Sequence, residues 1–455
     1  TSVIAVVLAG FSLGHWLGGR LAERPARAAL RATGWAMLAA AVSTAVAVML
    51  LQRLAGPVLQ TVGHPIWGIA VLAVLVFFVP SCFAGIPAPI LARIAVEGND
   101  QSGRALGAIF AAGAIGAIAG TLLAGFLFIS WLGTAATLMV VALTYIAAAL
   151  TCFAMAGWRA MLMPLLVGII ALGLAGLSIA TPNPCTRESR YFCLRSLDMS
   201  ADPASPVRLM VIDHLGHGIS AWDQPRVMFT EHAAMLDALA RLRAPHPDFS
   251  SFFIGGGSYS IPRAFADRGT GPRTVAEIDP AVTALAQQDF WFDPATAEIL
   301  HQDARQALLN RPDALYDVII GDAFTDVAVP AHLITEEFFT LVQSRLTPDG
   351  TFLMNVIDYS DRLHALASVA RTLQQVFPLV EIWTNTTRPD LGARVVFVLV
   401  AGSHRTPQDR FVAPAPDQVE FGAMADSWVA QISQSRGILL SDNFVPIDRL
   451  IGRPD

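Results

Sequence analysis

The sequence contains no lysine, so all thirty of its basic residues are arginine. Because Schiff-base enzymes and P-loop nucleotide hydrolases each need a lysine, pyridoxal-dependent chemistry and Walker-type phosphate binding are excluded. Cysteine is almost as scarce, with four residues in 455, and neither a CxxC nor an HExxH spacing occurs. A metal site is therefore not expected.

Charge is scarce in residues 1–181, which contain eight Arg against three acids and carry a net charge of +5. The whole chain carries −6, so the remainder carries the difference, −11. Long apolar runs separate the few arginines, and about 20 such residues are what a bilayer-spanning helix needs. We predict six spans, with a further span upstream of Thr1 left open: residues 1–19, 32–52, 66–92, 105–129, 132–156 and 161–180.

Small residues and prolines inside two of these spans predict how the helices pack. Gly113, Gly116 and Gly120 recur in the fourth span, where glycine lets helix backbones approach closely in lipid. The third span contains three prolines in "PSCFAGIPAPI", which predict a kink. Because no intramembrane Asp, Glu or Arg accompanies them, a packing kink is favoured over a transport site.

The distribution of arginine between the loops predicts the orientation of the chain. The loops after spans one, three and five contain seven arginines, whereas those after spans two and four contain only Arg53. Arginine-rich loops remain in the cytoplasm, so an even number of spans places the residues after 181 outside it. Cys185 and Cys193 lie there, eight residues apart, and are expected to form a disulfide in an oxidising compartment. Cys82 and Cys152 lie within spans and are interpreted as packing residues.

Beyond residue 181 the pattern changes to alternating strands and helices. Two short apolar runs, 207–213 and 216–222, predict a small β element. Seven runs of strand length follow, and helical stretches separate the first five, which is typical of a right-handed parallel αβ sheet. The last two runs, 379–385 and 394–402, lack a helix between them and predict an antiparallel edge. We expect four segments: a transmembrane domain (1–181), a β element (182–232), a Rossmann-like domain (233–402) and a C-terminal extension (403–455).

Glycines and acids follow the first four predicted strands of this sheet. Gly255, Gly256 and Gly257 end the first strand, Glu277 ends the second about 20 residues later, and Asp303 and Asp322 end the next two. In such sheets a ligand binds at the carboxyl ends of the strands, and an acid after the second strand accepts hydrogen bonds from ribose hydroxyls. The alternative is that the acids cap helices, which is plausible for Asp267 and Asp279.

The motifs "FFIGGGSYSIPRAF", "VAEIDP", "HQDARQALL", "YDVIIGDAFTD", "HLITEEFF" and "LTPDGTFLMNV" resemble the spermidine synthase, or polyamine aminopropyltransferase, family, a branch of the class I methyltransferase fold. The resemblance covers about residues 185–400. It implies that the glycine loop, Glu277 and Asp303 with Ala304 hold the nucleoside of decarboxylated S-adenosylmethionine. It also implies that Asp322 takes a proton from the attacking amine.

With "LAGFSLGHWLGGRLAER" and "LSDNFVPIDRLI" included, the whole chain resembles the bacterial membrane-spanning, or transporter-fused, spermidine synthases. The resemblance implies a multi-pass protein of the bacterial cytoplasmic membrane, whose partners are the lipid bilayer and a small amine. No nucleic-acid partner is expected, and a homo-oligomer is left open.

The chain departs from the family pattern where the acceptor amine binds. Ser258 and Tyr259 replace the Asp-Gly of the family's GGGDG loop, and Ser220 stands where the family has glutamine. Glu231 is retained from a Tyr-His-Glu motif, and Asp326 follows Asp322 at a spacing one residue longer than usual. A dication such as putrescine needs carboxylates at both ends. We therefore expect a monoamine or an amine-bearing lipid headgroup as acceptor, contacted by these five residues.

Two other functions stay open. An S-adenosylmethionine-dependent methyltransferase would use the same fold and nucleoside contacts. A non-catalytic nucleoside-binding domain attached to a half-transporter would bind the ligand without turnover. The predicted orientation is awkward for both enzymes, because S-adenosylmethionine and its decarboxylated form are made in the cytosol.

Overall fold

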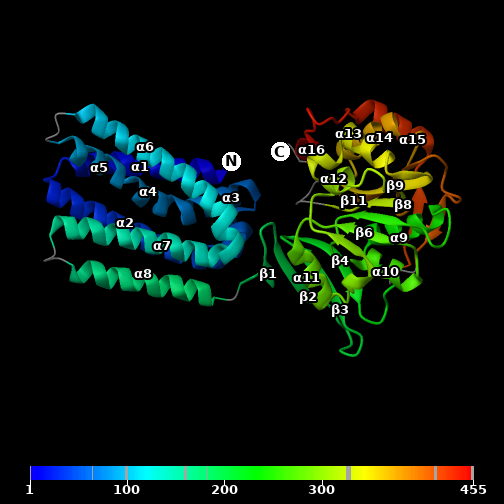
Figure 1. Ribbon diagram of the computed structural model, residues 1–455, viewed down its shortest axis with the longest axis horizontal. Coiled ribbons are helices and arrows are strands. Elements are labelled where there is room, and N and C mark those ends of the chain that lie inside the picture. The colour runs from blue at the N-terminus through cyan, green and yellow to red at the C-terminus, as the bar shows by residue number, and fades with distance from the viewer. Residues whose placement is uncertain are drawn as a thin grey trace. The chain divides into compact units, whose positions relative to one another are not determined.

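A computed structural model describes residues 2–63, 65–97, 101–157, 161–181, 183–323, 329–413 and 418–451. The chain forms two compact units, Thr1–Asn183 and Pro184–Asp455. Unit 1 consists of helices, and unit 2 contains all the strands of the described chain (Figure 1).

Unit 1 has five helices that are long and apolar enough to cross a membrane, judged by length and composition within the described residues. The third of these, Trp67–Val96, is interrupted at Ile86, directly before Pro87. This interruption agrees with the predicted kink. The helical elements are α1 (Ser2–Ala22), α2 (Ala26–Val62), α3 (Pro65–Ala73), η1 (Val74–Phe78), α4 (Val79–Gly85), α5 (Pro87–Val96), α6 (Ser102–Leu122), η2 (Leu123–Phe128), α7 (Ile129–Ala156) and α8 (Leu162–Ala180).

The helical segment Ser102–Ala156 is 55 residues long, and the sequence predicts two spans in this region. A straight helix of this length would be about 80 Å long, against a hydrocarbon core of about 30 Å. The backbone of Gly133 is not helical, with φ 75° and ψ 176°, and it breaks the run just after the predicted boundary. The break leaves room for two crossings within this segment.

Close helix packing in unit 1 occurs at glycines other than the predicted ones. A Cβ atom on Gly14 of α1 would lie 2.1 Å from the carbonyl oxygen of Cys82, and one on Gly18 would lie 2.4 Å from that of Ile86. Apart from the adjacent backbone of α6 itself, no heavy atom of the described chain lies within 4 Å of such an atom on Gly113, Gly116 or Gly120. Since α6 buries no residue within the described part of unit 1, the close approach expected at these three glycines is not made there and stays a prediction.

Unit 2 begins with a four-stranded antiparallel sheet, which is the predicted β element. Its strands, in spatial order, are β1 (Arg187–Glu188), β2 (Cys193–Asp198), β3 (Val207–Ile212) and β4 (Leu215–Ala221). Leu194, Met210 and Ile212 from this sheet are buried in a core that they share with the larger sheet.

The larger sheet is mixed and has nine strands in the order β12-β13-β10-β11-β9-β8-β5-β6-β7. The five strands from β7 to β9 are parallel, whereas β11 pairs antiparallel with both β9 and β10, which confirms the predicted antiparallel edge. The C-terminal extension adds β12 and β13 to this edge. The strands are β5 (Ser251–Ile254), β6 (Arg273–Ala276), β7 (Glu298–Leu300), β8 (Tyr316–Gly321), β9 (Leu346–Tyr359), β10 (Leu379–Asn385), β11 (Arg394–Gly402), β12 (Arg410–Val412) and β13 (Glu420–Ala423).

Helices cover both faces of this sheet, as the Rossmann-type prediction requires (Figure 1). Successive residues of β5 alternate between the faces: Phe252 and Ile254 join one core and Phe253 joins the other. Burying a large apolar side chain stabilises the fold by roughly 1.5–3 kcal/mol. Three helices pack on the face that Phe253 joins: α9 (Glu231–Arg243), α10 (Ser260–Arg268) and α11 (Pro280–Asp289). The other helical elements of unit 2 are η4 (Pro294–Thr296), α12 (Ala304–Leu309), η5 (Ala331–Leu333), α13 (Glu336–Gln343), α14 (His364–Val376), α15 (Asp426–Arg436) and α16 (Ile447–Ile451).

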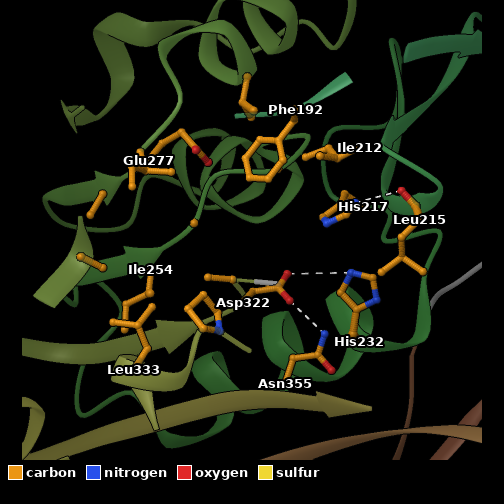
Figure 2. A pocket seen from close by; sticks show the side chains of 18 of the residues that line it. Phe192, Ile212, Leu215, His217, His232, Ile254, Glu277, Asp322, Leu333 and Asn355 are labelled. Atoms are coloured by element: carbon orange, nitrogen blue, oxygen red, sulfur yellow. Dashed lines mark hydrogen bonds and ion pairs between the residues drawn. The ribbon is translucent and has the colours of Figure 1, made fainter. Parts of the chain in front are cut away.

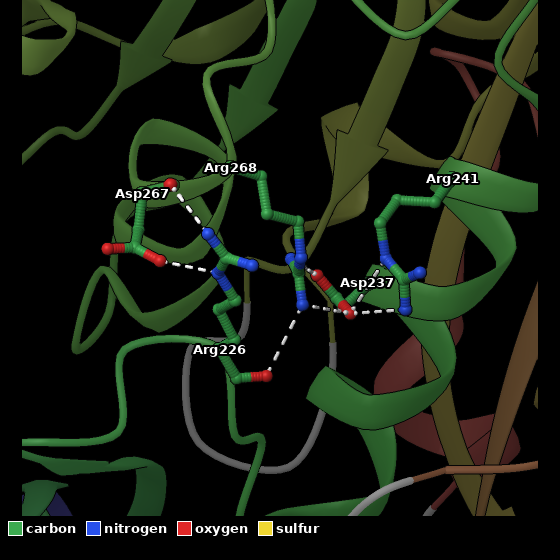
Figure 3. Close-up of polar contacts among 5 residues, drawn as sticks. All are labelled: Arg226, Asp237, Arg241, Asp267 and Arg268. Atoms are coloured by element: carbon green, nitrogen blue, oxygen red, sulfur yellow. Dashed lines mark hydrogen bonds and ion pairs between the residues drawn. The ribbon is translucent and has the colours of Figure 1, made fainter.

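An ion-pair network around the buried Asp237 links α9 to α10, the helix that follows the glycine loop (Figure 3). Asp237 of α9 is 4% exposed and accepts hydrogen bonds from Arg241, one turn further along the helix, and from Arg268 at the end of α10. Arg226 bonds Asp267 of α10 in the same group. A buried carboxylate is tolerated only when it is paired, so the network holds the C-terminal end of α10 against α9.

Candidate functional site

A pocket of about 540 Å³ lies at the carboxyl ends of the parallel strands (Figure 2). Its walls come from the ends of β5, β6 and β8, from β9, and from the small sheet and the start of α9. The polar or charged lining residues are Tyr191, His217, Thr230, Glu231, His232, Glu277, Gln302, Asp303, Asp322, His332 and Asn355. The strand-end acids are thus brought together at one site.

The glycine loop lies directly against the end of β8. Gly255 has a φ of 92°, and a Cβ atom on it would lie 2.8 Å from the carbonyl oxygen of Asp322. Gly255 and Gly257 line the pocket, and the N–H of Gly256 donates to Glu277 Oε2 at 2.9 Å. A side chain at Gly255 would both strain the backbone and close this approach.

Glu277 holds the loop and the end of β6 in place. Its second oxygen, Oε1, accepts a hydrogen bond from the N–H of Asp279 at 2.9 Å, and the side chain is 6% exposed. Burial raises the pKa of Glu277, and its backbone hydrogen bonds oppose that rise. Each carboxylate oxygen can still accept a further hydrogen bond, so a ribose hydroxyl can bind here.

Asp303 both caps a helix and contacts a histidine. Its Oδ1 accepts from the N–H of Gln306 at 3.0 Å and caps α12, while Oδ2 lies 2.7 Å from His332 Nε2. Ala304 follows at the first position of α12 and also lines the pocket. Asp279 caps α11 by accepting from the N–H of Ala281 at 2.9 Å, as the capping alternative predicts.

Asp322 lies between an amide and an imidazole (Figure 2). Asn355 Nδ2 donates to Asp322 Oδ1 at 2.9 Å, and His232 Nε2 lies 3.8 Å from Asp322 Oδ2. The Asp322 side chain is 25% exposed, so it can be reached from the pocket. The amide fixes one oxygen and leaves the other to meet a ligand.

His217 contributes a second imidazole to the same part of the pocket (Figure 2). Its Nδ1 lies 2.9 Å from the carbonyl oxygen of Leu215, which requires Nδ1 to be the protonated nitrogen. Its Nε2 is buried and has no hydrogen-bond partner among the described residues. Burial lowers the pKa of His217, which favours the neutral ring, in which Nε2 carries the lone pair.

The predicted acceptor residues separate into two groups. Glu231 lines the pocket and accepts from Asn385 Nδ2 at 2.8 Å. Ser220, Ser258 and Tyr259 are 3%, 2% and 0% exposed, and none of them lines the pocket. Asp326 lies outside the described residues.

The burial of Ser258 and Tyr259 has a local cause. Tyr259 has a φ of 55° and directs its ring into the core, where it stacks on Phe292 at 4.1 Å between centroids. Its hydroxyl lies 2.6 Å from Thr283 Oγ1. Ser258 is directed at β4, because a Cβ atom on Gly218 would lie 2.1 Å from Ser258 Oγ. These side chains support the loop from behind and do not face the pocket.

The disulfide predicted between Cys185 and Cys193 is present, and it closes a loop that reaches the pocket. Tyr191 and Phe192 from this loop line the pocket, and Figure 2 shows the Phe192 ring beside Glu277. Ser189 in the loop bonds Asp279 at the end of β6. The cross-link therefore constrains part of the pocket wall.

Sequence reasoning missed His217, His232, Asn355 and Phe192. Asn355 could have been found, because it is the one polar residue in the apolar run "FLMNVI" and a buried polar side chain needs a partner. The others lie on elements with no periodic pattern that directs them to the strand ends. Within the described chain, no group of three or more His, Cys, Asp or Glu side chains is arranged to hold a metal ion.

The fold defines unit 2 as a Rossmann-type domain with a pocket at its strand ends. Residues 274–409 match the spermine/spermidine synthase domain family. The chain is 30% identical over 206 residues to the N-terminal histidine N-methyltransferase of Emericella nidulans, which is 41% of this chain and 36% of that protein. It is 32% identical over 145 residues to polyamine aminopropyltransferase 2 of Pseudomonas aeruginosa, covering 29% and 41%.

The domain match and the aminopropyltransferase homologues support the spermidine synthase family for this part of the chain. The chain spans less than half the length of each of these curated relatives. A solved structure, a probable spermidine synthase from Corynebacterium glutamicum, aligns with a TM-score of 0.49 at 22% identity, over 58% of this chain and 99% of that one.

Proposed function

We propose that unit 2 transfers an aminopropyl group from decarboxylated S-adenosylmethionine to an amine other than putrescine. The observation that carries this proposal is the charge of the pocket. Four carboxylates line it, those of Glu231, Glu277, Asp303 and Asp322, and no arginine does among its described lining residues. Such a pocket suits a donor that carries a sulfonium and an ammonium, and opposes one with a free carboxylate.

The donor's nucleoside would lie over the glycine loop. The ribose hydroxyls would bond Glu277, and the base would lie near Asp303 and Ala304, as the family resemblance implies. The apolar residues Ile254, Ile278 and Leu333 line the same pocket and would cover the base. The sulfonium would then point toward Asp322.

Asp322 would position the acceptor and accept its proton. The nitrogen lone pair attacks the aminopropyl carbon bonded to sulfur, the C–S bond breaks, and its electron pair remains on sulfur as methylthioadenosine. The nitrogen's proton passes to the Asp322 carboxylate, which Asn355 holds in place. Because a sulfonium is already a good leaving group, alignment and proton removal are sufficient.

Putrescine is a poor candidate acceptor for this pocket. Its second ammonium needs a carboxylate, but the residue at the family's acidic position, Ser258, is buried behind the loop. Of the predicted acceptor residues that the structure describes, only Glu231 remains in the pocket. A small monoamine or an amine-bearing lipid headgroup is therefore proposed.

The test uses the full chain, purified in detergent and in lipid nanodiscs. We expect methylthioadenosine to be released from decarboxylated S-adenosylmethionine when a suitable amine is present, measured by chromatography. Putrescine should support slower release than ethanolamine. Efficient transfer to putrescine would contradict the acceptor part of the proposal.

Methyl transfer from S-adenosylmethionine is a second candidate. It is favoured by the match to the N-terminal histidine N-methyltransferase, which covers 206 residues. In the same assay it predicts S-adenosylhomocysteine from S-adenosylmethionine, and no methylthioadenosine from the decarboxylated donor. Tight nucleoside binding with neither product would instead identify unit 2 as a non-catalytic binding domain attached to a half-transporter.

We further propose that unit 1 anchors the protein in the bacterial cytoplasmic membrane, with the bilayer as its partner and unit 2 outside the cytoplasm. The five long apolar helices, the break at Gly133 and the loop arginines support a multi-pass arrangement. The disulfide supports an oxidising compartment.

The orientation has a direct test. A reporter that is active only outside the cytoplasm, fused after Asp455, should be active in cells. Cys185 and Cys193 should resist alkylation until they are reduced. Reporter activity confined to the cytoplasm, together with freely reactive thiols, would reverse the orientation and favour a cytosolic enzyme.

A further inference from the structure

A groove of about 530 Å³ adjoins the pocket. The proposed reaction assigns it no role. It lies along the hairpin of β10 and β11, beside β13 and α15. Phe397, Met424 and Trp428 give it an apolar lining, and three arginines line it as well, Arg388, Arg394 and Arg410. The groove is therefore apolar in part and cationic in part.

Two of these arginines have no internal counter-ion. Arg388 and Arg394 are exposed, and no carboxylate of the described chain makes an ion pair with either of them. Among the described residues, the ion pair of Arg410 is a long one, 3.8 Å from its Nη1 to Glu420 Oε1, and the Arg410 side chain is 70% exposed. Three guanidinium groups around one groove repel each other, and an anion bound between them would relieve that repulsion.

The groove and the reaction pocket share a wall. Glu231 lines both, and its Oε1 accepts the hydrogen bond from Asn385 of the groove. Carboxylates, including Asp322, therefore lie on the pocket side of this wall and guanidinium groups lie on the groove side. A molecule that reaches across it meets opposite charges at its two ends.

We infer that the acceptor carries a phosphate as well as a primary amine, and that Arg388, Arg394 and Arg410 bind the phosphate while Glu231 and Asp322 meet the amine. This inference rests on the proposed function, because it assigns the acceptor of that reaction. Guanidinium forks match the oxygens of a phosphate, which can carry more charge than a carboxylate. Putrescine would instead place its second ammonium beside three arginines. The shared chemistry is a phosphoethanolamine group, either free or as a lipid headgroup.

The experiment compares phosphoethanolamine with ethanolamine as acceptors for the full chain. In the double variant Arg388→Gln/Arg394→Gln, KM for phosphoethanolamine should rise about 10-fold or more, the usual effect of removing charged hydrogen bonds. Turnover of ethanolamine should change less than about 2-fold, since it does not reach the groove. Arg449→Gln, an exposed arginine of α16 outside both pockets, is the matched control and should change neither value.

A binding measurement separates failure of this inference from failure of the proposed reaction. Phosphoethanolamine should bind the methylthioadenosine-loaded protein by calorimetry, and the double variant should lose that binding even if no amine is ever alkylated. Equal binding to wild type and double variant, or no binding to wild type in solution or in phosphatidylethanolamine nanodiscs, would overturn the inference. Arginine-dependent turnover only in those nanodiscs identifies the lipid headgroup as the source, and the same dependence with the soluble compound identifies free phosphoethanolamine.

Discussion

The two ends of the proposed site are built in different ways. The nucleoside end consists of the glycine loop and of acids that directly follow β6 and β7, each tied to backbone N–H groups. The acceptor end consists of side chains from separate elements: His217 from β4, His232 from α9 and Asn355 from β9. The sheet itself places the first end, whereas the second depends also on how β4 and α9 pack against that sheet.

This difference predicts which residues can be substituted without loss of nucleoside binding. Altering Ser258 leaves the nucleoside contacts intact, because its side chain lies behind the loop. Altering Arg388 or Arg394 changes the groove without changing a residue that lines the pocket. If the proposed function holds, substitutions at the two ends of the site should separate binding from turnover.

The largest effect is expected at Asp322, where the two ends meet. Asp322→Asn keeps the shape of the side chain but removes the base, so turnover should fall about 100-fold or more while methylthioadenosine binding is retained. Asp313→Asn, at an exposed position outside the pocket, is the control. Loss of nucleoside binding in Asp322→Asn would mean that Asp322 belongs to the nucleoside end.

A second substitution tests whether Ser258 faces the acceptor. Ser258→Asp would bury a charge with no partner against β4, and it should destabilise unit 2 by about 3 kcal/mol. Ser260→Asp, at the first residue of α10, should be tolerated, because an acid is favourable at a helix N-terminus. Thermal unfolding of both variants measures this difference. A stable Ser258→Asp protein with faster putrescine transfer would return Ser258 to the acceptor site.

Within the nucleoside end, Glu277 and Asp303 should contribute unequally. Glu277→Ala and Asp303→Ala should each weaken methylthioadenosine binding by about 1–3 kcal/mol. Glu277→Ala should lie at the upper end, because it also releases the N–H groups of Gly256 and Asp279. Calorimetric titration measures both values. Unchanged affinity in both folded variants would exclude a nucleoside from this pocket.

The smallest expected effect is on pH dependence at the acceptor end. Burial lowers the pKa of His217 below its ordinary value of 6.5, so the unfolded chain binds a proton near that pH while the folded chain does not. The folded state therefore loses stability as pH falls from about 6.5 toward the lower folded pKa. In His217→Gln that loss should disappear, measured as a smaller drop in Tm between pH 7.5 and pH 5.5, both values being about one unit from the ordinary pKa. An equal change in His214→Gln, an exposed control, would contradict this assignment.

Helix packing in unit 1 shows that glycine spacing alone does not identify the helix face that is covered within the described chain. Glycines at helical spacing occur in both α1 and α6, and sequence alone does not say which stripe meets a neighbour. Gly14 and Gly18 approach the backbone of the α4 region, whereas Gly113, Gly116 and Gly120 approach no other helix of the described chain as closely. Spacing determines which residues share a face, but only the packed helices determine which face is covered.

Five features could be predicted from the sequence alone: the apolar helices of unit 1, the alternating strands and helices of unit 2, the antiparallel edge, the disulfide and the acids at the strand ends. These depend on local periodicity and on a rule of parallel sheets, which places the carboxyl ends of neighbouring strands at one edge. Three features became visible only in the folded chain. Ser258 and Tyr259 face the core, and His217, His232 and Asn355 line the pocket together with Asp322. Three arginines line the groove on the other side of the wall that contains Glu231. These are contacts between residues far apart in the chain, and their geometry follows from backbone conformation and packing, which no local pattern encodes.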